Sequence, residues 1–352
     1  MSARRNGTGA ASRTARRDGA AAGSAVDLRV RIGSLALRNP ILTASGTFGY
    51  GDEYAHIIDL RLLGGVITKT ITLAPRPGNA PVRIAETASG MLNSIGLENV
   101  GLERYVREKL PKLRSLGATV IVSVGGETPR ELVRLVEALA DAPDVAGFEI
   151  NFSCPNVSKG GARYWAVPRR LERTLGALRR LTRRPLIAKL SPDVTSISDL
   201  ARACEQGGAD ALTAVNTFVG MAVDLEAGRN RLNRATGGLS GPAIKPLALA
   251  RCAEAAAAVK IPVIGSGGVM NGRDALEFLA IGARAVQVGT LSFIRPRAVL
   301  EVVEAMTSWL AAHGHRSLDR WIGCLAGAPA ASGPPAPSPA LAPAPAREEV
   351  HR

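Results

Sequence analysis

The stretch from Ile261 to Thr290, IPVIGSGGVMNGRDALEFLAIGARAVQVGT, decides the fold. It begins with a short apolar run, Pro262–Gly265, and closes with a second one, Ala285–Gly289, and an amphipathic helical pattern over Asp274–Ile281 separates the two. Short apolar runs joined through a helix are typical of parallel strands that are buried on both faces. The stretch therefore predicts one strand–helix–strand unit of an α/β protein.

The same unit recurs along most of the chain. Eight short apolar runs predict strands: Ile41–Ala44, Gly65–Lys69, Val120–Val124, Gly147–Asn151, Leu186–Leu190, Ala211–Asn216, Pro262–Gly265 and Ala285–Gly289. Amphipathic helical stretches separate most of these runs, among them Glu131–Ala140, Pro168–Leu181, Ile197–Gln206, Asp274–Ile281 and Arg297–Ala311. Eight strands that alternate with helices fit best a (β/α)8 barrel, the TIM barrel fold, which takes about 250 residues. A doubly wound open sheet is the alternative for this pattern.

Three further segments predict hairpins. Thr72–Leu97 and Gly220–Gly241 are too long for ordinary strand–helix loops and carry Gly, Pro and Asn turn signals. Long loops in compact domains are usually functional, so we expect each to form a small hairpin or lid at the C-terminal face of the barrel. Leu28–Leu37 alternates around Gly33-Ser34, which predicts a hairpin that caps the barrel floor.

Two tails of different composition flank the barrel pattern. Residues 1–25 hold five arginines opposed only by Asp18, and residues 326–352 are rich in Ala and Pro without a hydrophobic period. Such compositions cannot bury a core, so we expect both tails to be disordered. The barrel domain is predicted to span residues 26–325.

The formal net charge of the 352-residue chain is +14, which raises nucleic-acid binding as an alternative. Beyond the N-terminal tail, arginine doublets lie within helical patterns without interleaved aromatics, which favours solvated helix faces. No apolar stretch reaches the ~20 residues of a membrane span. The four cysteines lie far apart, which argues against disulfides or a cluster held by this chain and favours the cytoplasm: Cys154, Cys204, Cys252 and Cys324.

Polar or glycine residues directly follow the predicted strands. In a TIM barrel the active site lies at the C-terminal ends of the strands, so these residues converge on one face. A turn explains a single strand-end glycine or asparagine, but it does not explain two lysines and two amides on the same face. In chain order the positions are Ala44-Ser45-Gly46, Lys69-Thr70, Ser123, Asn151, Lys189, Asn216-Thr217, Gly267-Gly268 and Gly289-Thr290.

The last two of these positions predict a phosphate site. Gly265-Ser266-Gly267-Gly268 ends the seventh strand and Gly289-Thr290 ends the eighth. The loops after these two strands commonly bind phosphate in TIM barrels, and glycine lets backbone N–H groups approach the oxygens closely. The two loops together suggest a phosphorylated ligand such as FMN.

The segment Asn151-Phe152-Ser153-Cys154-Pro155-Asn156 carries the most chemical information. It ends the fourth strand and places a thiol between two amides, which suit a planar polar ring. Cys204 and Cys252, by contrast, are interpreted as small buried hydrophobes. No histidine is expected near this segment, so neither a His-based triad nor a metal site is predicted. The general base is the thiol, a lysine or a carboxylate.

Four motifs resemble the dihydroorotate dehydrogenase family: NPILTASG (residues 39–46), GMLNSIGL (90–97), NFSCPN (151–156) and TGGLSGP (236–242). The resemblance covers about residues 26–309. The cysteine in the SCPN segment is typical of class 1, and residues 75–97 with TGGLSGP look most like the NAD-linked class 1B. The resemblance implies one FMN per chain and a partner subunit that carries FAD and a [2Fe–2S] cluster. The expected assembly is a homodimer at the core of a heterotetramer.

The resemblance also implies roles for individual residues. Cys154 would be the catalytic base. The orotate site would comprise Lys69, Asn93, Ser94, Ile95, Gly96, Leu97, Asn151, Asn156, Asn216 and Thr217. The FMN site would comprise Ser45, Lys69, Thr70, Ser123, Asn151, Lys189, Val215, Gly241, Gly267, Gly268, Gly289 and Thr290. Ser123 departs from many relatives, which have Asn there, and a serine reaches less far toward the flavin.

The implied reaction is oxidation of dihydroorotate to orotate in pyrimidine biosynthesis. A proton leaves C5 to Cys154, a hydride leaves C6 to the flavin, and Lys189 stabilises the charge of the reduced ring. NAD, reached through the partner, is the expected electron acceptor, ahead of fumarate or a quinone. The alternatives are a dihydropyrimidine dehydrogenase-like FMN enzyme, a basic nucleic-acid-binding protein and a catalytically silent barrel.

Overall fold

The computed structural model describes residues 26–153 and 164–327. The two predicted tails lie outside this range, except residues 326 and 327. Cys154 and Asn156 of the NFSCPN segment also lie outside the described residues. None of the helices in the described part of the chain combines the length and apolar character that crossing a membrane requires.

Eight parallel strands form the central sheet, in the order β3-β16-β15-β10-β9-β8-β7-β4. They are β3 (Ile41–Thr43), β4 (Val66–Ile67), β7 (Val120–Val124), β8 (Gly147–Asn151), β9 (Leu186–Lys189), β10 (Ala211–Ala214), β15 (Val263–Ser266) and β16 (Ala283–Val288). Backbone hydrogen bonds join the two ends of this sheet: Gly64 N–H donates to Ile41 O at 2.9 Å and Thr43 N–H to Gly65 O at 3.2 Å. The sheet is therefore a closed barrel, which confirms the predicted TIM barrel and excludes the open sheet.

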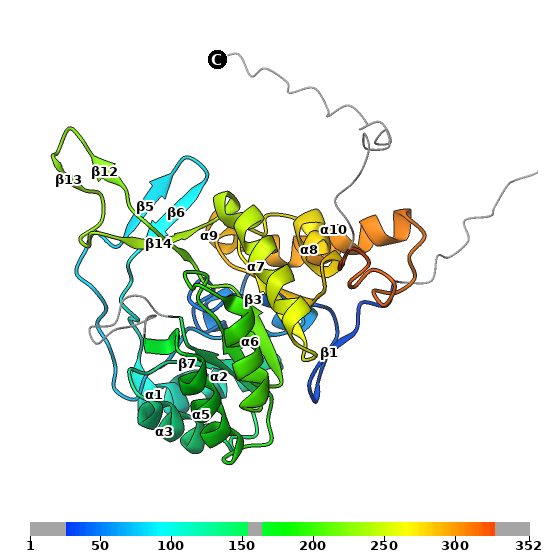
Figure 1. The fold of residues 1–352 in the computed structure, drawn as a ribbon, viewed down its shortest axis with the longest axis horizontal. Coiled ribbons are helices and arrows are strands. Elements are labelled where there is room, and N and C mark those ends of the chain that lie inside the picture. The colour runs from blue at the N-terminus through cyan, green and yellow to red at the C-terminus, as the bar shows by residue number, and fades with distance from the viewer. Residues whose placement is uncertain (1–25, 154–163, 328–352) are drawn as a thin grey trace, which may run out of the picture.

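Helices connect the strands and surround the barrel. Those of α type are α1 (Gly101–Arg104), α2 (Leu110–Ser115), α3 (Pro129–Leu139), α5 (Pro168–Arg179), α6 (Ile197–Gln206), α7 (Lys245–Ala258), α8 (Gly272–Ala280), α9 (Leu291–Ile294) and α10 (Ala298–Ala312). Short 3-10 helices are η1 (Asp52–Tyr54), η2 (Leu60–Leu62) and η4 (Pro242–Ile244), and a π-helical turn, η3 (Tyr105–Lys109), joins α1 to α2. In Figure 1, α1, α3 and α5 lie at the lower left and α7, α8 and α10 at the upper right.

Helix α3 illustrates how the sequence sets a helix against the barrel. Thr128 Oγ1 accepts a hydrogen bond from Glu131 N–H at 3.3 Å, and the Glu131 carboxylate accepts one from Glu127 N–H at 2.9 Å. This capping arrangement starts the helix at Pro129, two residues before the predicted start, because proline is well suited to the first turn. One face is fully buried at helical spacing, by Leu132, Leu135, Val136 and Leu139.

Several barrel strands end before the predicted boundary. The predicted strand Gly65–Lys69 is reduced to Val66–Ile67, and the predicted strand Ala211–Asn216 ends at Ala214. Lys69 and Asn216, which follow these strands, line a cavity instead. The polar ends thus leave the strand ladder to face the mouth of the barrel.

The two long insertions form one antiparallel sheet, here termed the insertion sheet. It consists of β5 (Ile84–Thr87), β6 (Gly90–Asn93), β11 (Phe218–Gly220) and β14 (Gly237–Ser240), in the order β11-β14-β6-β5. A further hairpin, β12 (Val223–Asp224) with β13 (Arg229–Asn230), lies beyond it, and both protrude together in Figure 1. Each predicted hairpin is present, but the pairing of β6 with β14 unites them, and Ala85, Leu92 and Leu232 form a small core between them.

The predicted floor hairpin is also present. β1 (Val30–Ile32) pairs antiparallel with β2 (Leu35–Leu37) across the turn Gly33-Ser34, where Gly33 has a φ of +57°. A Cβ at Gly33 would lie 2.9 Å from Cβ of Asp210, the residue before β10. The hairpin therefore lies at the N-terminal end of the barrel, opposite to the insertion sheet.

Candidate active site

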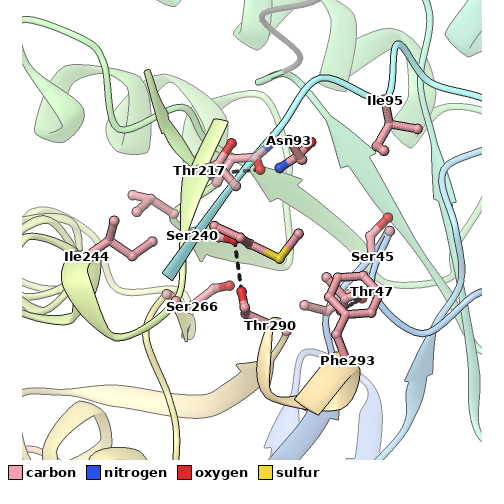
Figure 2. Close-up of a pocket in the computed structure, with 18 of the residues that line it drawn as sticks. Ser45, Thr47, Asn93, Ile95, Thr217, Ser240, Ile244, Ser266, Thr290 and Phe293 are labelled. Atoms are coloured by element: carbon pink, nitrogen blue, oxygen red, sulfur yellow. Dashed lines mark hydrogen bonds between the residues drawn. The ribbon is translucent and has the colours of Figure 1, made fainter. Parts of the chain in front are cut away.

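A cavity of about 370 Å³ lies between the C-terminal ends of the barrel strands and the insertion sheet. Figure 2 shows Ser45, Thr47, Thr290 and Phe293 on one side of it and Asn93 and Thr217 on another. Most of the residues predicted from the sequence line it: Ser45, Lys69, Thr70, Asn93, Ile95, Gly96, Leu97, Asn151, Lys189, Val215, Asn216, Thr217, Gly241, Gly267, Gly268, Gly289 and Thr290. The structure thus brings together side chains from both insertions and from the strand ends.

The register of the barrel places Asn151 and Lys189 side by side at the cavity floor. Their Cα atoms are partners in the β8–β9 ladder, and Thr213 is the partner of Lys189 on the other side. Lys189 is only 4% exposed, and its Nζ donates a hydrogen bond to Gln287 Oε1 at 3.1 Å. Its Nζ also lies 3.6 Å from a carboxylate oxygen of Glu149, which is fully buried.

A chain of hydroxyl groups runs under one wall of the cavity. Thr70 Oγ1 lies 3.0 Å from Ser45 Oγ and 2.9 Å from Ser123 Oγ. It also accepts a hydrogen bond from Asn151 Nδ2 at 3.3 Å. Ser123 is fully buried and is not part of the cavity lining. Its contact with the cavity is therefore indirect, through Thr70.

The residue that precedes Cys154 is firmly anchored. Ser153 N–H and Oγ both donate to Asn151 Oδ1, at 3.2 and 2.9 Å, and Asn216 Nδ2 donates to Ser153 Oγ at 2.6 Å. Asn216 Oδ1 in turn accepts from Thr217 N–H at 2.8 Å. These bonds fix the end of β8 next to two residues that line the cavity.

The glycine loops after β15 and β16 form another wall. Gly267 and Gly268 have φ values of +125° and +75°, which favour glycine. Among the described residues, the backbone N–H groups of Gly267, Gly268, Gly289 and Thr290 donate to no other backbone group. Thr290 Oγ1 donates to Ser240 Oγ at 2.9 Å, which ties the loop after β16 to the insertion sheet (Figure 2). This wall offers unused backbone donors, as an anion site requires.

Ser94 lies away from the cavity, although its neighbours Asn93 and Ile95 line it. It is 1% exposed and accepts a hydrogen bond from Asn79 Nδ2 at 3.1 Å. Consecutive residues of an extended segment point to opposite sides, so Asn93 and Ile95 share a face that Ser94 does not.

The sequence alone did not identify several lining residues, including Met91, Ser240, Ile244 and Phe293. The alternation of β6 could have identified Met91, which lies two residues before Asn93 and so on the same face. Ser240 belongs to the TGGLSGP motif, from which the family resemblance implies only Gly241 as a binding residue. Phe293 lies one turn into α9, where no strand-end rule applies.

Cys204 and Cys252 are fully buried, as predicted for small apolar residues. Burial alone raises the pKa of the Cys204 thiol and raises that of Cys252 to about 12. Both are therefore protonated at neutral pH and unsuited to act as a base. Among the described residues, no group of three or more His, Cys, Asp or Glu side chains could hold a metal ion.

Comparison with known proteins identifies the family. The family model described as dihydroorotate dehydrogenase matches residues 27–310. This chain belongs to the dihydroorotate dehydrogenase family. The resemblance predicted from the four motifs is thereby confirmed. The "Dihydroorotate dehydrogenase B (NAD(+)), catalytic subunit" of Trichlorobacter lovleyi is 50% identical over 300 residues, which cover 85% of this chain and 99% of that protein.

Further relatives agree with this dihydroorotate dehydrogenase assignment. The protein of the same description from Geobacter sulfurreducens is 48% identical over 299 residues, 85% of this chain and 98% of that one. Among solved structures, "Crystal structure of DHODH in complex with ferulenol from Eimeria tenella" aligns with a TM-score of 0.69 at 23% identity, over 85% of this chain and 88% of that one. That likeness supports the barrel fold.

Proposed function

We propose that this chain is the catalytic subunit of an NAD-linked dihydroorotate dehydrogenase, which oxidises dihydroorotate to orotate in pyrimidine biosynthesis. The observation that carries the proposal is the set of donors in one cavity: Lys69, Asn93, Asn151, Asn216 and Thr217. Amides can both donate and accept along the edge of a pyrimidine ring, and an ammonium group balances a ring carboxylate. The names of the relatives, NAD-linked catalytic subunits at about half identity, support the same reaction.

The cavity fits FMN as the resident cofactor. Backbone donors at Gly267, Gly268, Gly289 and Thr290, which bond to no backbone group in the described part of the chain, suit a phosphate, and a cavity of about 370 Å³ lies in the size range of small-ligand sites. We assign FMN binding to these residues together with Ser45, Lys69, Thr70, Asn151, Lys189, Val215 and Gly241, and to Ser123 through Thr70. Bound FMN supplies the two-electron acceptor for the hydride that leaves C6 of the substrate.

Cys154 is assigned as the base that takes the proton from C5. The anchoring of Ser153 by Asn151 and Asn216 supports this, because it fixes the residue that directly precedes Cys154 in sequence beside two residues that line the cavity. The thiolate is the competent form, and a free cysteine has a pKa of about 8.5. Substrate binding is assigned to Lys69, Asn93, Ile95, Gly96, Leu97, Asn151, Asn156, Asn216 and Thr217. Ser94 supports the segment around Asn93 and Ile95 from the side that faces away from the cavity.

The electron path and assembly complete the proposal. Electrons pass to NAD through a partner subunit with FAD and a [2Fe–2S] cluster, in a cytoplasmic heterotetramer built on a homodimer. The names of the relatives, which include both NAD(+) and a catalytic subunit, support the acceptor and the existence of a partner.

A purified sample tests the reaction directly. We expect flavin absorption in the visible range, and bleaching when dihydroorotate is added without air. A chain that takes up no FMN, or that keeps its colour with dihydroorotate, would contradict the proposal. Binding of orotate compared with uracil separates the dihydropyrimidine dehydrogenase alternative, because only the carboxylated ring uses the charge of Lys69.

A further inference from the structure

A buried carboxylate lies below the cavity floor. Glu149 occupies the middle of β8, two residues before Asn151, and its side chain is 0% exposed. The interior of a TIM barrel is ordinarily filled by branched apolar residues, and a buried charge is costly unless it is paired. A glutamate at this position therefore calls for a compensating role.

Three side chains from three other strands surround this carboxylate. Its Oε2 accepts hydrogen bonds from Gln287 Nε2 at 2.6 Å and from Thr213 Oγ1 at 3.1 Å. Gln287 Oε1 accepts from Lys189 Nζ at 3.1 Å, so Gln287 bridges the carboxylate and the ammonium group. The network thus links β8, β9, β10 and β16 directly beneath the cavity.

The second oxygen of Glu149 makes no hydrogen bond to any described residue, although it is buried. It lies 3.6 Å from Lys189 Nζ, which is close enough for a charge interaction but too far for a hydrogen bond. Lys189 has three N–H donors and lines the cavity. The ammonium group is therefore oriented by Gln287 and balanced by Glu149 while it keeps donors for a ligand.

We propose that Glu149 is a positioning residue that acts through Lys189: its charge keeps the cavity floor close to neutral and so limits how strongly the floor favours an anionic ligand. Without this carboxylate the floor would carry the full positive charge of Lys189. The inference rests on the proposed function in one respect, that FMN occupies the cavity. A floor that is too positive would favour the reduced, anionic flavin ring and hold back its electrons.

The test is the midpoint potential of bound FMN in Glu149→Gln, measured by reductive titration against a dye, without substrate. We expect reduced FMN to gain at least tenfold in binding relative to oxidised FMN, an upward shift of about 30 mV for two electrons. Thr213→Val is the matched control, because it removes one hydrogen bond to Glu149 but no charge. Thr213→Val should change the binding of reduced FMN relative to oxidised FMN by less than about twofold.

Two further variants separate charge from structure. Glu149→Asp retains the charge and should keep the potential near that of the parent. Glu149→Gln with Lys189→Met makes the floor neutral again, and its potential should fall back to or below the parent value. The proposal would be overturned if Glu149→Gln changed the binding of reduced FMN relative to oxidised FMN by less than about twofold. It would also be overturned if Thr213→Val shifted the midpoint potential as much as Glu149→Gln does.

The titration uses no dihydroorotate, so the two proposals can fail separately. If the chain binds FMN and Glu149→Gln shifts its midpoint potential, but dihydroorotate does not reduce the flavin, the inference about Glu149 holds and the proposed reaction is wrong. If the chain oxidises dihydroorotate but Glu149→Gln leaves the midpoint potential unchanged, the proposed reaction holds and the inference is wrong.

Discussion

Substitution of Lys189 by methionine should destabilise the barrel strongly, since it leaves the Glu149 carboxylate buried without its counter-charge. The ammonium and carboxylate groups lie 3.6 Å apart, and both side chains are nearly inaccessible to solvent, 6% and 0% exposed. At an effective dielectric constant of about 20, two unit charges at this distance attract by about 5 kcal/mol. Breaking a buried pair by removing one partner typically costs about 3–5 kcal/mol. We therefore expect Lys189→Met to lower the free energy of unfolding by about 3–5 kcal/mol, out of the ~5–15 kcal/mol typical of domains.

The double variant supplies the control. Glu149→Gln with Lys189→Met removes both charges, and replacing a whole buried pair is often nearly neutral, so it should lie within about 1 kcal/mol of the parent. Guanidinium unfolding of flavin-free protein is the assay, because bound ligand adds its own stabilisation. A loss below about 1 kcal/mol in the single variant, or a double variant no more stable than the single one, would refute this reasoning.

Three further predictions concern the glycine loop, the base and the buried thiols. Gly268→Ala should lower FMN affinity at least tenfold in a fluorescence titration, because Gly268 has a φ of +75° and a Cβ there would lie 2.6 Å from the Lys245 backbone nitrogen. Gly314→Ala, at φ +76° with nothing within 4 Å of its Cβ, is the matched control and should retain the parent affinity. Cys154→Ser should slow anaerobic flavin reduction by dihydroorotate by orders of magnitude with orotate binding kept, and a stopped-flow rate near that of the parent would argue against Cys154 as the base. Burial raises the pKa of Cys252 from 9.0 to about 12. The protonated thiol therefore contributes to stability fully below about pH 9. This contribution to the free energy of unfolding is lost as the pH rises toward 12, by about 1.4 kcal/mol per pH unit. Cys252→Ala should reduce that slope in unfolding experiments, leaving the part due to Cys204, while Cys324→Ala, at an exposed position, should not change it, and equal slopes in both variants would contradict the assignment.

The barrel was predictable because its signal is local. Each strand is a short apolar run, and the residue type changes where the run ends, so Lys69, Asn151, Lys189 and Asn216 could be placed at one face without any knowledge of pairing. The boundaries were less accurate. Lys69 and Asn216 were included in strands that end two residues earlier, because propensity does not show where a polar end leaves the ladder.

The parts that could not be predicted depend on contacts between distant residues. Asn93 Nδ2 donates to Gly238 O across 145 positions of sequence, so neither insertion alone reveals that the two share a sheet. Glu149 was missed for a related reason. Within GFEIN it resembles any polar residue in a strand, and only the closed barrel brings Gln287 and Lys189 to it.

The pairing of β6 with β14 also bears on how such a chain can change during evolution or engineering. Shortening either insertion would strip the other of its neighbour and expose a row of unmatched backbone groups, which invites association with other molecules. Loops of a barrel are usually exchanged one at a time, but here the segments around residues 84–93 and 218–240 must be transplanted together or not at all.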